Sequence, residues 1–569
     1  MRRTFFFIFL GLVFLFSEGQ SDNALSAPKN TLVNASAPGG QHLPSIALGP
    51  SNQTYIVWVD CRNDPTCETS TDIYFARSTD GGESFEAEVL VSDDGTSFAN
   101  SPKIAVDDSG DLYAVWHDNR TGDSWDVYLS KSEDGGATFS PAVRVNEYIS
   151  NVFQYEPDVA LDQHGNIYVS WNRYYYDADL DQWDYDVYVA KSIDGGSTFG
   201  SNVRVNDGSD WQYKSSIKVG RSGKVYVVWT DRRNGGISDV YFAKSVNGGH
   251  TFSANSRIHQ YAEQSQGYPE MALDEDEVIY VVWNDARNLY KKNRRDVFMA
   301  RSLDSGDSFE PEMRINDAKI PAAFEYFYPA ITAWGKGHVA VAWEDKREGT
   351  YDVYLTRSDN GGLSFRPSWR LNRARKKSQS VPDIVMDAMG QVHCAWRDGR
   401  TGEFQTYFAL DPSVKSVVKV LSPKGGEVFA PGDEVTIEWD ALKQAVSFDL
   451  YYSVNGGTTW KEIFLGWTGS PYRWTIPPIK GKKKKSYVKV LAFDAEGNRV
   501  GGDKSEEPFT IEAVRVAAPG EAPAPVCRQA RLPTGRQAAY PANLPVIQRG
   551  IGLWHCRNDS TTFDFWIFL

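Results

Sequence analysis

Three carboxylates stand at corresponding places in a repeated segment of this chain, where they could carry out acid–base chemistry. The repeat aligns on Pro44, Pro102, Pro157, Ser215, Pro269, Pro329 and Pro382. The residues that follow are Ser45, Lys103, Asp158, Ser216, Glu270, Ala330 and Asp383. Only Asp158, Glu270 and Asp383 are carboxylates, and a carboxyl group can serve as the acid/base in glycoside hydrolysis. These three are therefore candidate catalytic residues.

Aromatic and acidic side chains come just before several of these positions. They are Tyr155, Glu156, Trp211, Tyr213, Tyr268, Glu325, Tyr326 and Tyr328. Tyrosine and tryptophan offer flat faces to sugar rings and polar tips for hydrogen bonds. We predict ligand contacts from four of the tyrosines: Tyr155, Tyr213, Tyr268 and Tyr326.

A second repeat, Trp-x-Asp-x-Arg, is broken in one unit. It occurs at Trp58-Asp60-Arg62, Trp116-Asp118-Arg120, Trp229-Asp231-Arg233, Trp283-Asp285-Arg287, Trp343-Asp345-Arg347 and Trp396-Asp398-Arg400. After Trp171, however, Arg173 takes the Asp position and Tyr175 the Arg position, and the sequence up to Asp186 is longer, aromatic and acidic. Regular recurrence favours a structural role, whereas the break favours function. The predicted ligand contacts here are Arg173, Tyr174, Tyr175 and Trp183; the alternative is a surface loop folded over its neighbour.

Acidic residues alternate in the same stretch. Asp177, Asp179 and Asp181 have the spacing of oxygen ligands for Ca²⁺. The glycine and the terminal glutamate of an EF-hand loop are missing. We therefore predict no metal and no cofactor, with these three aspartates as the candidates if a metal is bound.

Tight turns with a common sequence recur in phase with both repeats. They are Ser78–Phe85, Ser132–Phe139, Ser192–Phe199, Ser245–Phe252, Ser302–Phe309 and Ser358–Phe365, with a seventh copy at Ser453–Trp460. The shared pattern is Ser-x-Asp/Asn-x-Gly-x-Ser/Thr-Phe/Trp, in which the Asp or Asn can bond the backbone of the turn and the glycines permit positive φ. This pattern resembles the Asp-box, or BNR, repeat of sialidase-like β-propellers, and the resemblance implies that fold.

The units between the turns read as four strands each. In the second unit the expected strands are Lys103–Val106, Leu112–His117, Asp126–Lys131 and Ala142–Asn146. The last unit, Val381–Pro412, has three strands and no Asp box, and Thr31–Asn34 resembles a missing fourth strand. We therefore predict an all-β fold, a seven-bladed β-propeller in which the N-terminal strand completes the last blade.

The resemblance also implies where an active site would lie. In sialidase-like propellers it is on the face away from the Asp boxes, where the loops after Trp-x-Asp-x-Arg are expected. Sialidases use three arginines for the sialate carboxylate, the first in a Phe/Tyr-Arg-Ile-Pro motif before the first blade. No such motif occurs in this sequence, so the resemblance assigns no catalytic set to named residues.

The chain divides into four predicted parts. Residues 1–19 read as a signal peptide, with a basic start, an apolar run and a small-x-small cleavage site. The propeller is expected over residues 30–412, and a small Ig-like or fibronectin-like β-sandwich over 417–512. Residues 513–569 read as a linker and a disordered tail.

The predicted signal peptide implies an exported protein, in which cysteines close in sequence can form a disulfide. Cys61 and Cys67 are close in sequence, and we predict that they form a local disulfide rather than a metal site. Cys394 is expected to be a buried apolar residue. The formal net charge of -14 argues against nucleic acid as a partner.

These observations leave three functional hypotheses open. The first is a secreted recognition protein, extracellular or in the cell envelope, that binds a glycan or another cell-surface ligand. The second is an exo-glycosidase of sialidase type, and the third is an envelope scaffold for protein interactions. We expect a monomer with no membrane span. Converging arginines beside a Tyr–Glu pair would favour the second hypothesis, an aromatic groove without them the first, and a flat polar face the third.

Overall fold

The computed structural model describes most of the chain. The described residues are 28–34, 39–50, 53–93, 97–177, 181–289, 294–317, 328–388, 390–411, 418–441, 445–493, 499–512, 526–529, 553–557 and 566–568. The predicted signal peptide lies outside them, as do Asp179 and Tyr326. All named elements are β-strands, and in the described part no helix is long and apolar enough to cross a membrane.

Four-stranded antiparallel sheets account for the described chain up to residue 411. Their first strands are β2 (Gln41–Leu48), β6 (Asn100–Val106), β10 (Phe153–Leu161), β14 (Gln212–Val219), β18 (Gln266–Leu273), β22 (Ala330–Trp334) and β26 (Gln379–Met386). The second strands are β3 (Thr54–Asp60), β7 (Leu112–Asp118), β11 (Ile167–Asp177), β15 (Val225–Asn234), β19 (Ile279–Asp285), β23 (His338–Asp345) and β27 (Val392–Asp398). The third strands are β4 (Asp72–Ser78), β8 (Asp126–Ser132), β12 (Gln182–Ser192), β16 (Ile237–Ser245), β20 (Asp296–Ser302), β24 (Asp352–Ser358) and β28 (Gln405–Leu410). The short fourth strands are β5 (Val89–Leu90), β9 (Val143–Arg144), β13 (Val203–Arg204), β17 (Ser256–Arg257), β21 (Met313–Arg314), β25 (Trp369–Arg370) and β1 (Thr31–Leu32).

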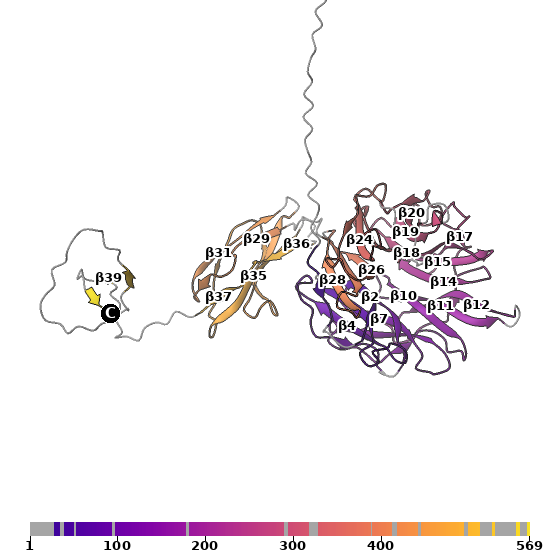
Figure 1. Ribbon diagram of the computed structural model, residues 1–569, viewed down its shortest axis with the longest axis horizontal. Coiled ribbons are helices and arrows are strands. Elements are labelled where there is room, and N and C mark those ends of the chain that lie inside the picture. The colour runs from indigo at the N-terminus through magenta and orange to yellow at the C-terminus, as the bar shows by residue number, and fades with distance from the viewer. Residues whose placement is uncertain are drawn as a thin grey trace, which may run out of the picture. The chain divides into compact units, whose positions relative to one another are not determined.

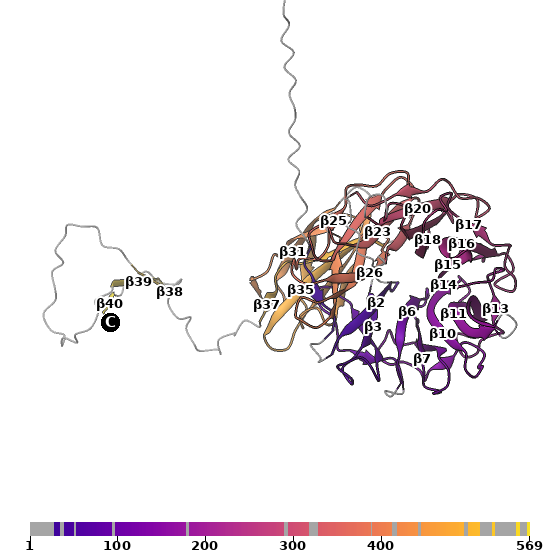
Figure 2. The same ribbon diagram turned by 45° about the vertical axis from the view of Figure 1, so that its right-hand side comes forward.

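The sheets stand around a common centre, with their first strands toward it (Figure 2). Each first strand contacts the first strands of two neighbouring sheets, and β26 contacts β2. The N-terminal strand β1 pairs with β28, Thr31 opposite Phe408 and Leu32 opposite Tyr407. The last sheet in sequence therefore has its fourth strand from the start of the chain, which leaves the third strand β28 paired on both sides.

The repeated tryptophans form the core between the sheets. All seven, Trp171 included, are fully buried. In the second sheet Trp116 Nε1 donates to Asp118 Oδ2 at 2.8 Å, and Arg120 Nη2 donates to the same oxygen at 2.7 Å. The Arg120 guanidinium also lies over the ring of Tyr128 on the third strand. The repeat is thus a buried structural cluster, in which the arginine is paired with the aspartate of its own repeat.

The Asp-box turns join each sheet to the one before it. Ser132 Oγ donates to Asp134 Oδ1, and the backbone N–H of Gly136 donates to Ser132 Oγ, both at 2.8 Å. Gly136 has a φ of 88°, and a Cβ there would lie 2.1 Å from a ring atom of Phe75 in the preceding sheet. Phe139 packs edge-on against the same Phe75 ring. Any larger residue than glycine would therefore separate neighbouring sheets.

A second compact unit comprises Lys419–Asp440, Phe448–Val490 and Asp503–Leu569. The strands from β29 to β37 form two sheets: one contains β29 (Val418–Ser422), β31 (Glu434–Ala441) and β34 (Tyr472–Thr475), and the other contains β30 (Val428–Phe429), β37 (Phe509–Ile511), β35 (Lys483–Phe493), β32 (Ser447–Ser453), β33 (Lys461–Trp467) and β36 (Arg499–Lys504). The seventh Asp box has the same bonds as the others, since Ser453 Oγ donates to Asn455 Oδ1 at 2.9 Å. In the tail, which we expected to be disordered, the strands β38 (Val526–Gln529), β39 (Leu553–Arg557) and β40 (Trp566–Phe568) pair with one another.

Candidate functional site

Most first strands enter the centre of the ring through a β-bulge. The register shifts between Tyr155 and Asp158 in β10 and at the matching place in five other first strands. The bulge residue has a left-handed φ between 49° and 57° in each case: Leu43, Ser101, Glu156, Lys214, Tyr268 and Val381. This conformation is unfavourable for residues other than glycine, above all for a β-branched one. It turns six side chains into the mouth of the central channel, which the sequence patterns did not indicate.

Polar residues between Trp and Asp in the repeat hold these bulges in place. The backbone N–H of Tyr268 donates to Thr230 Oγ1 at 2.9 Å, and that of Val381 donates to Glu344 Oε1 at 2.8 Å. In each pair the acceptor belongs to the preceding sheet. The variable position of Trp-x-Asp-x-Arg therefore couples neighbouring sheets at the mouth.

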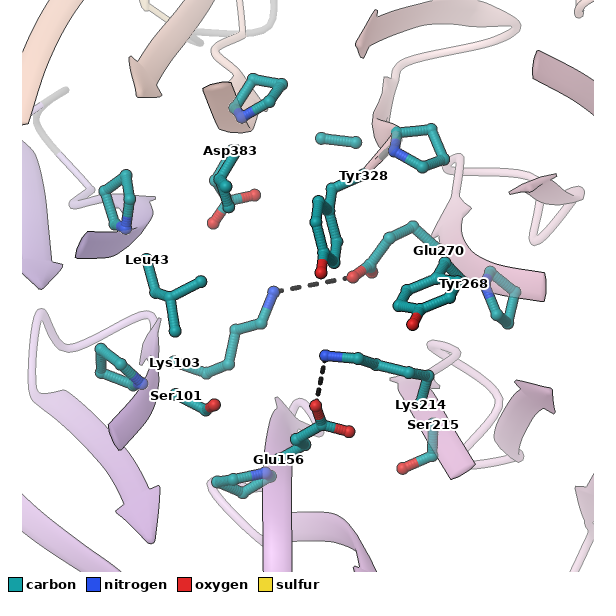
Figure 3. Close-up of a pocket in the computed structure, with 18 residues that line it drawn as sticks. Leu43, Ser101, Lys103, Glu156, Lys214, Ser215, Tyr268, Glu270, Tyr328 and Asp383 are labelled. Atoms are coloured by element: carbon teal, nitrogen blue, oxygen red, sulfur yellow. Dashed lines mark ion pairs between the residues drawn. The ribbon is translucent and has the colours of Figure 1, made fainter. Parts of the chain in front are cut away.

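Two lysines extend across the mouth of the channel (Figure 3). Lys214 Nζ pairs with Glu156 and lies 5.6 Å from the ring centres of Tyr268 and Tyr328. Lys103 Nζ lies 3.7 Å from Glu270 Oε1. Both carboxylates raise the pKa of the lysine they face, against the effect of burial. Both ammonium groups are therefore charged and already have partners.

The predicted carboxylates Asp158, Glu270 and Asp383 do converge in the channel. With Lys103 and Lys218 they form a charged layer below the mouth. Above this layer the cavity has a volume of about 130 Å³, and below it, toward the Asp boxes, about 500 Å³. The cavity is thus smaller on the face where a ligand was expected.

Asp158 and Asp383 connect neighbouring first strands. Asp158 accepts the backbone N–H of Val159 and, through its other oxygen, that of Ile217 in the next sheet, both at 2.9 Å. Asp383 does the same with Ile384 and with Ile46, the latter at 3.1 Å. Backbone donors hold both oxygens of each carboxylate, so the geometry gives these two residues a structural role; a catalytic role for them stays a prediction.

Glu270 differs, because no backbone group holds its carboxylate among the described contacts. The hydroxyl of Ser216 lies 3.1 Å from Glu270 Oε2 and 3.2 Å from Asp158 Oδ2. At Glu270 burial prevails over the attraction of Lys103 and raises the pKa. At Asp158 burial is outweighed by Lys218 and Lys103, so its pKa is lowered. Opposite shifts of this kind accompany acid and base roles in neighbouring carboxyl groups.

The aromatic stretch of the third unit is a long hairpin and not a surface loop. Strands β11 and β12 are longer than their counterparts in the other sheets (Figure 1). They pair along their whole length, with Ile167 opposite Ser192 at one end and Asp177 opposite Gln182 at the other. Side chains alternate along a strand, so Tyr174 and Tyr176 lie on one face and Arg173 and Tyr175 on the other.

One face of this hairpin carries a continuous row of stacked rings, which we call the aromatic ledge: Phe153, Tyr174, Tyr176, Trp183, Tyr185 and Trp211. Tyr174 stacks between Trp183, at 4.7 Å between ring centres, and Tyr185, at 4.3 Å. Trp211 meets Tyr185 edge-on and donates from Nε1 to the carbonyl oxygen of Trp183. Trp183 and Tyr176 are 42% and 47% exposed, respectively. The ledge thus presents large ring surfaces to solvent while packing holds its shape.

The predicted contacts Arg173 and Tyr175 lie on the opposite face. The Arg173 guanidinium is 5.2 Å from the ring centres of Tyr175 and Tyr188. Tyr188 corresponds to Tyr128, so Arg173 fills the position that the repeated arginines occupy in other sheets. The structure brings Tyr174 and Trp183 to the ledge but does not bring Arg173 and Tyr175 there.

The remaining predicted residues divide between the ledge and the mouth. Tyr155 adjoins the ledge through Phe153, at 6.2 Å between ring centres. Tyr213 lies edge-on to Tyr268, which lines the mouth. The side chain of Asp177 lies outside the described residues, and Asp181 accepts the hydroxyl of Tyr176.

The predicted disulfide is present in the structure, between Cys61 and Cys67. His42 Nε2 lies 3.8 Å from Cys67 Sγ. These three residues form the only group of potential metal ligands found among the described residues. The disulfide occupies both sulfur atoms, so the group offers no metal site in this form. Cys394 is free and buried, as expected.

A buried carboxyl group at the base of the hairpin gives a pH-dependent prediction. Asp184 is 2% exposed, and burial raises its pKa to about 6, with a further contribution from Asp186. A folded-state pKa above the unfolded value stabilises the fold at low pH, and this stabilisation is lost as the pH rises through 6. Asp184→Asn should therefore stabilise the protein more at pH 7.5 than at pH 5. The gain in the free energy of unfolding should differ between the two pH values by on the order of 1 kcal/mol.

Thermal unfolding of both proteins at the two pH values measures this difference. The exposed Asp108→Asn is the control and should show no such dependence. An equal effect of Asp184→Asn at pH 5 and pH 7.5 would mean that Asp184 is ionised throughout this range.

Comparison with known proteins identifies the ring of sheets. Residues 66–341 match the BNR repeat-like domain family. This part of the chain therefore resembles a BNR repeat-like domain. The sialidase-like propeller type that the Asp boxes indicated is thereby confirmed, and no curated protein matches the chain.

Solved structures with a similar arrangement are distant from this BNR propeller. The ulvan lyase PL25 has 14% identity and a TM-score of 0.47, over 68% of this chain and 94% of the lyase. An α-L-arabinofuranosidase from Fusarium graminearum has 10% identity and a TM-score of 0.42, over 68% and 97%. The Hadza microbial sialidase Hz136 has 14% identity and a TM-score of 0.38, over 60% and 73%. At this level of likeness these structures assign no ligand to the BNR propeller.

Proposed function

We propose that the protein is a secreted glycan-binding protein, extracellular or in the cell envelope. It consists of a seven-bladed propeller and a C-terminal β-sandwich, and it acts as a monomer. The aromatic ledge of the third blade is its principal binding surface, and the adjoining channel mouth is secondary. A glycan or a glycosylated cell surface is the expected partner.

The exposed stacked rings carry this proposal. Sugar rings bind aromatic faces through their C–H groups, and rigid aromatic side chains lose little conformational entropy on binding. Tyr174 is stacked between Trp183 and Tyr185 and holds both rings in place, so the exposed face of Trp183 is preorganised. Among the described residues the extended aromatic hairpin belongs to the blade where Trp-x-Asp-x-Arg is broken, which supports a role beyond the common fold.

The residues at the channel mouth favour binding over hydrolysis of a sialidase type. Among the described residues that line this cavity there is no arginine. The two lysines there have carboxylate partners within the protein. The constellation that would indicate a sialidase is therefore missing from the described mouth, whereas the aromatic surface is present.

A glycan array with the full-length protein tests the proposal. Wild-type protein should bind a defined set of glycans, and Tyr174→Ala combined with Trp183→Ala should weaken that binding by about tenfold or more. Trp334→Ala is the matched control, since Trp334 is 37% exposed away from the ledge. Unchanged binding by the double variant, with a normal melting temperature, would place the site elsewhere.

A glycoside hydrolase remains the second candidate, because one observation favours it. The Ser216 hydroxyl lies within hydrogen-bonding distance of both Glu270 and Asp158, so two carboxyl groups meet in the channel, as glycoside hydrolysis requires. The raised pKa of Glu270 suits a general acid.

This candidate predicts turnover in a fluorogenic glycoside panel. Glu270→Gln should lower the rate by about a hundredfold or more, whereas the exposed Glu133→Gln should not. Because Glu270 must be protonated to act as the acid, the wild-type rate should fall as the pH rises through its raised pKa. Absence of turnover by wild-type protein on the whole panel would eliminate this candidate and leave the binding proposal intact.

A further inference from the structure

An arginine with no ion pair among the described residues stands at one end of the aromatic ledge. The residue between Asp and Arg in the repeat is Cys61, Asn119, Arg232, Ala286, Lys346 or Gly399. Arg232 is therefore an additional arginine, directly before the repeated Arg233. Arg233 is bound to Asp231 and Asp207, whereas the described ion pairs include none for Arg232.

Arg232 is held against the ledge and not left free in solvent. Its guanidinium lies 5.2 Å from the ring centre of Trp211, and its Nε donates to the carbonyl oxygen of Gly236 at 3.3 Å. Its backbone N–H donates to the carbonyl oxygen of Trp211 at 3.0 Å. Two anchors therefore fix the planar group, while its two terminal nitrogens have no described protein acceptor.

This arrangement matches the recognition of a carboxylate. A guanidinium presents two parallel N–H groups that fit the two oxygens of a carboxylate, and stacking on an aromatic ring fixes the plane of the fork. Trp211 is 38% exposed and contacts Tyr185, so the cation is continuous with the stacked rings. A sugar ring on the ledge would thus have a cation within the same surface.

We propose that the ledge selects glycans that contain uronic acids, with Arg232 as the subsite for the sugar carboxylate. The inference rests on the proposed function of the ledge and adds the chemical class of its ligand. The net charge of the protein is -14, so long-range attraction does not explain such a preference; a local cation is required.

The test uses pairs of oligosaccharides that differ only in charge. Oligogalacturonate, oligomannuronate and oligoglucuronate are each titrated into full-length protein beside their methyl esters, and neutral glycans are screened on the array. Wild-type protein should bind at least one acid about tenfold more tightly than its ester, and the difference should shrink as salt is raised. Arg232→Gln should remove the difference while leaving binding of the ester unchanged.

Two variants separate charge from packing. Arg232→Lys keeps the charge but not the two-pronged geometry and should retain only part of the preference. Arg221→Gln removes one charge from a 67% exposed arginine elsewhere and should change nothing. Equal binding of acids and esters by wild-type protein overturns the inference but leaves the ledge as a glycan site. Equal weakening of both ligands by Arg232→Gln also overturns it, and absence of all glycan binding overturns this inference and the proposed function together.

Discussion

Trp116→Ala should lower the stability of the propeller by on the order of 3 kcal/mol or more. Trp116 is fully buried, and its core cluster contains Tyr55 and Phe75 of the first blade. The substitution leaves a cavity between two blades and deprives Asp118 of the Nε1 donor at 2.8 Å. Thermal unfolding followed by circular dichroism measures the loss.

Trp334→Ala provides the comparison for this experiment. Trp334 is 37% exposed, so its removal should cost less than about 1 kcal/mol. If Trp116→Ala melted at the wild-type temperature, the repeated tryptophans would not form the core between blades.

Asp158→Ala should have an effect of similar size, again about 3 kcal/mol. The substitution leaves the backbone N–H groups of Val159 and Ile217 unpaired in a buried place. It also takes from Lys218 an acceptor at 3.4 Å. Because Ile217 belongs to the next blade, the loss should weaken the contact between blades.

Asp158→Asn distinguishes the hydrogen bonds from the charge. The amide keeps a carbonyl oxygen for one backbone donor, so this variant should lose only part of the stability that Asp158→Ala loses. If Asp158→Ala were as stable as the wild-type protein, Asp158 would have no structural role, and its carboxylate would be available for catalysis.

Much of the architecture could be predicted from the sequence, because the turns and strands are determined by residues within each segment. An Asp-box turn is made by its own residues, so Ser132–Phe139 and the distant copy Ser453–Trp460 form the same bonds. The pairing of Thr31 with Phe408 followed from counting strands. The convergence of Asp158, Glu270 and Asp383 followed from their common position in the repeat.

The finer features of the site depend on neighbouring blades and had no local pattern. A left-handed φ at Val381 is not expected from a β-branched residue, and it is held by Glu344 of the preceding blade. The hydrogen bond from the backbone N–H of Ile46 to Asp383 joins residues far apart in sequence. A surface loop was the alternative interpretation of the stretch after Trp171, although its tyrosines and tryptophan are residue types that favour strands.

A crystal structure of the full-length protein with the tightest-binding glycan from the array would show where the ligand lies. We expect a sugar ring stacked on Trp183, at the ledge of the third blade. A glycan bound elsewhere, in the channel mouth or on the C-terminal unit, with Trp183 and Tyr174 free of contact, would contradict it.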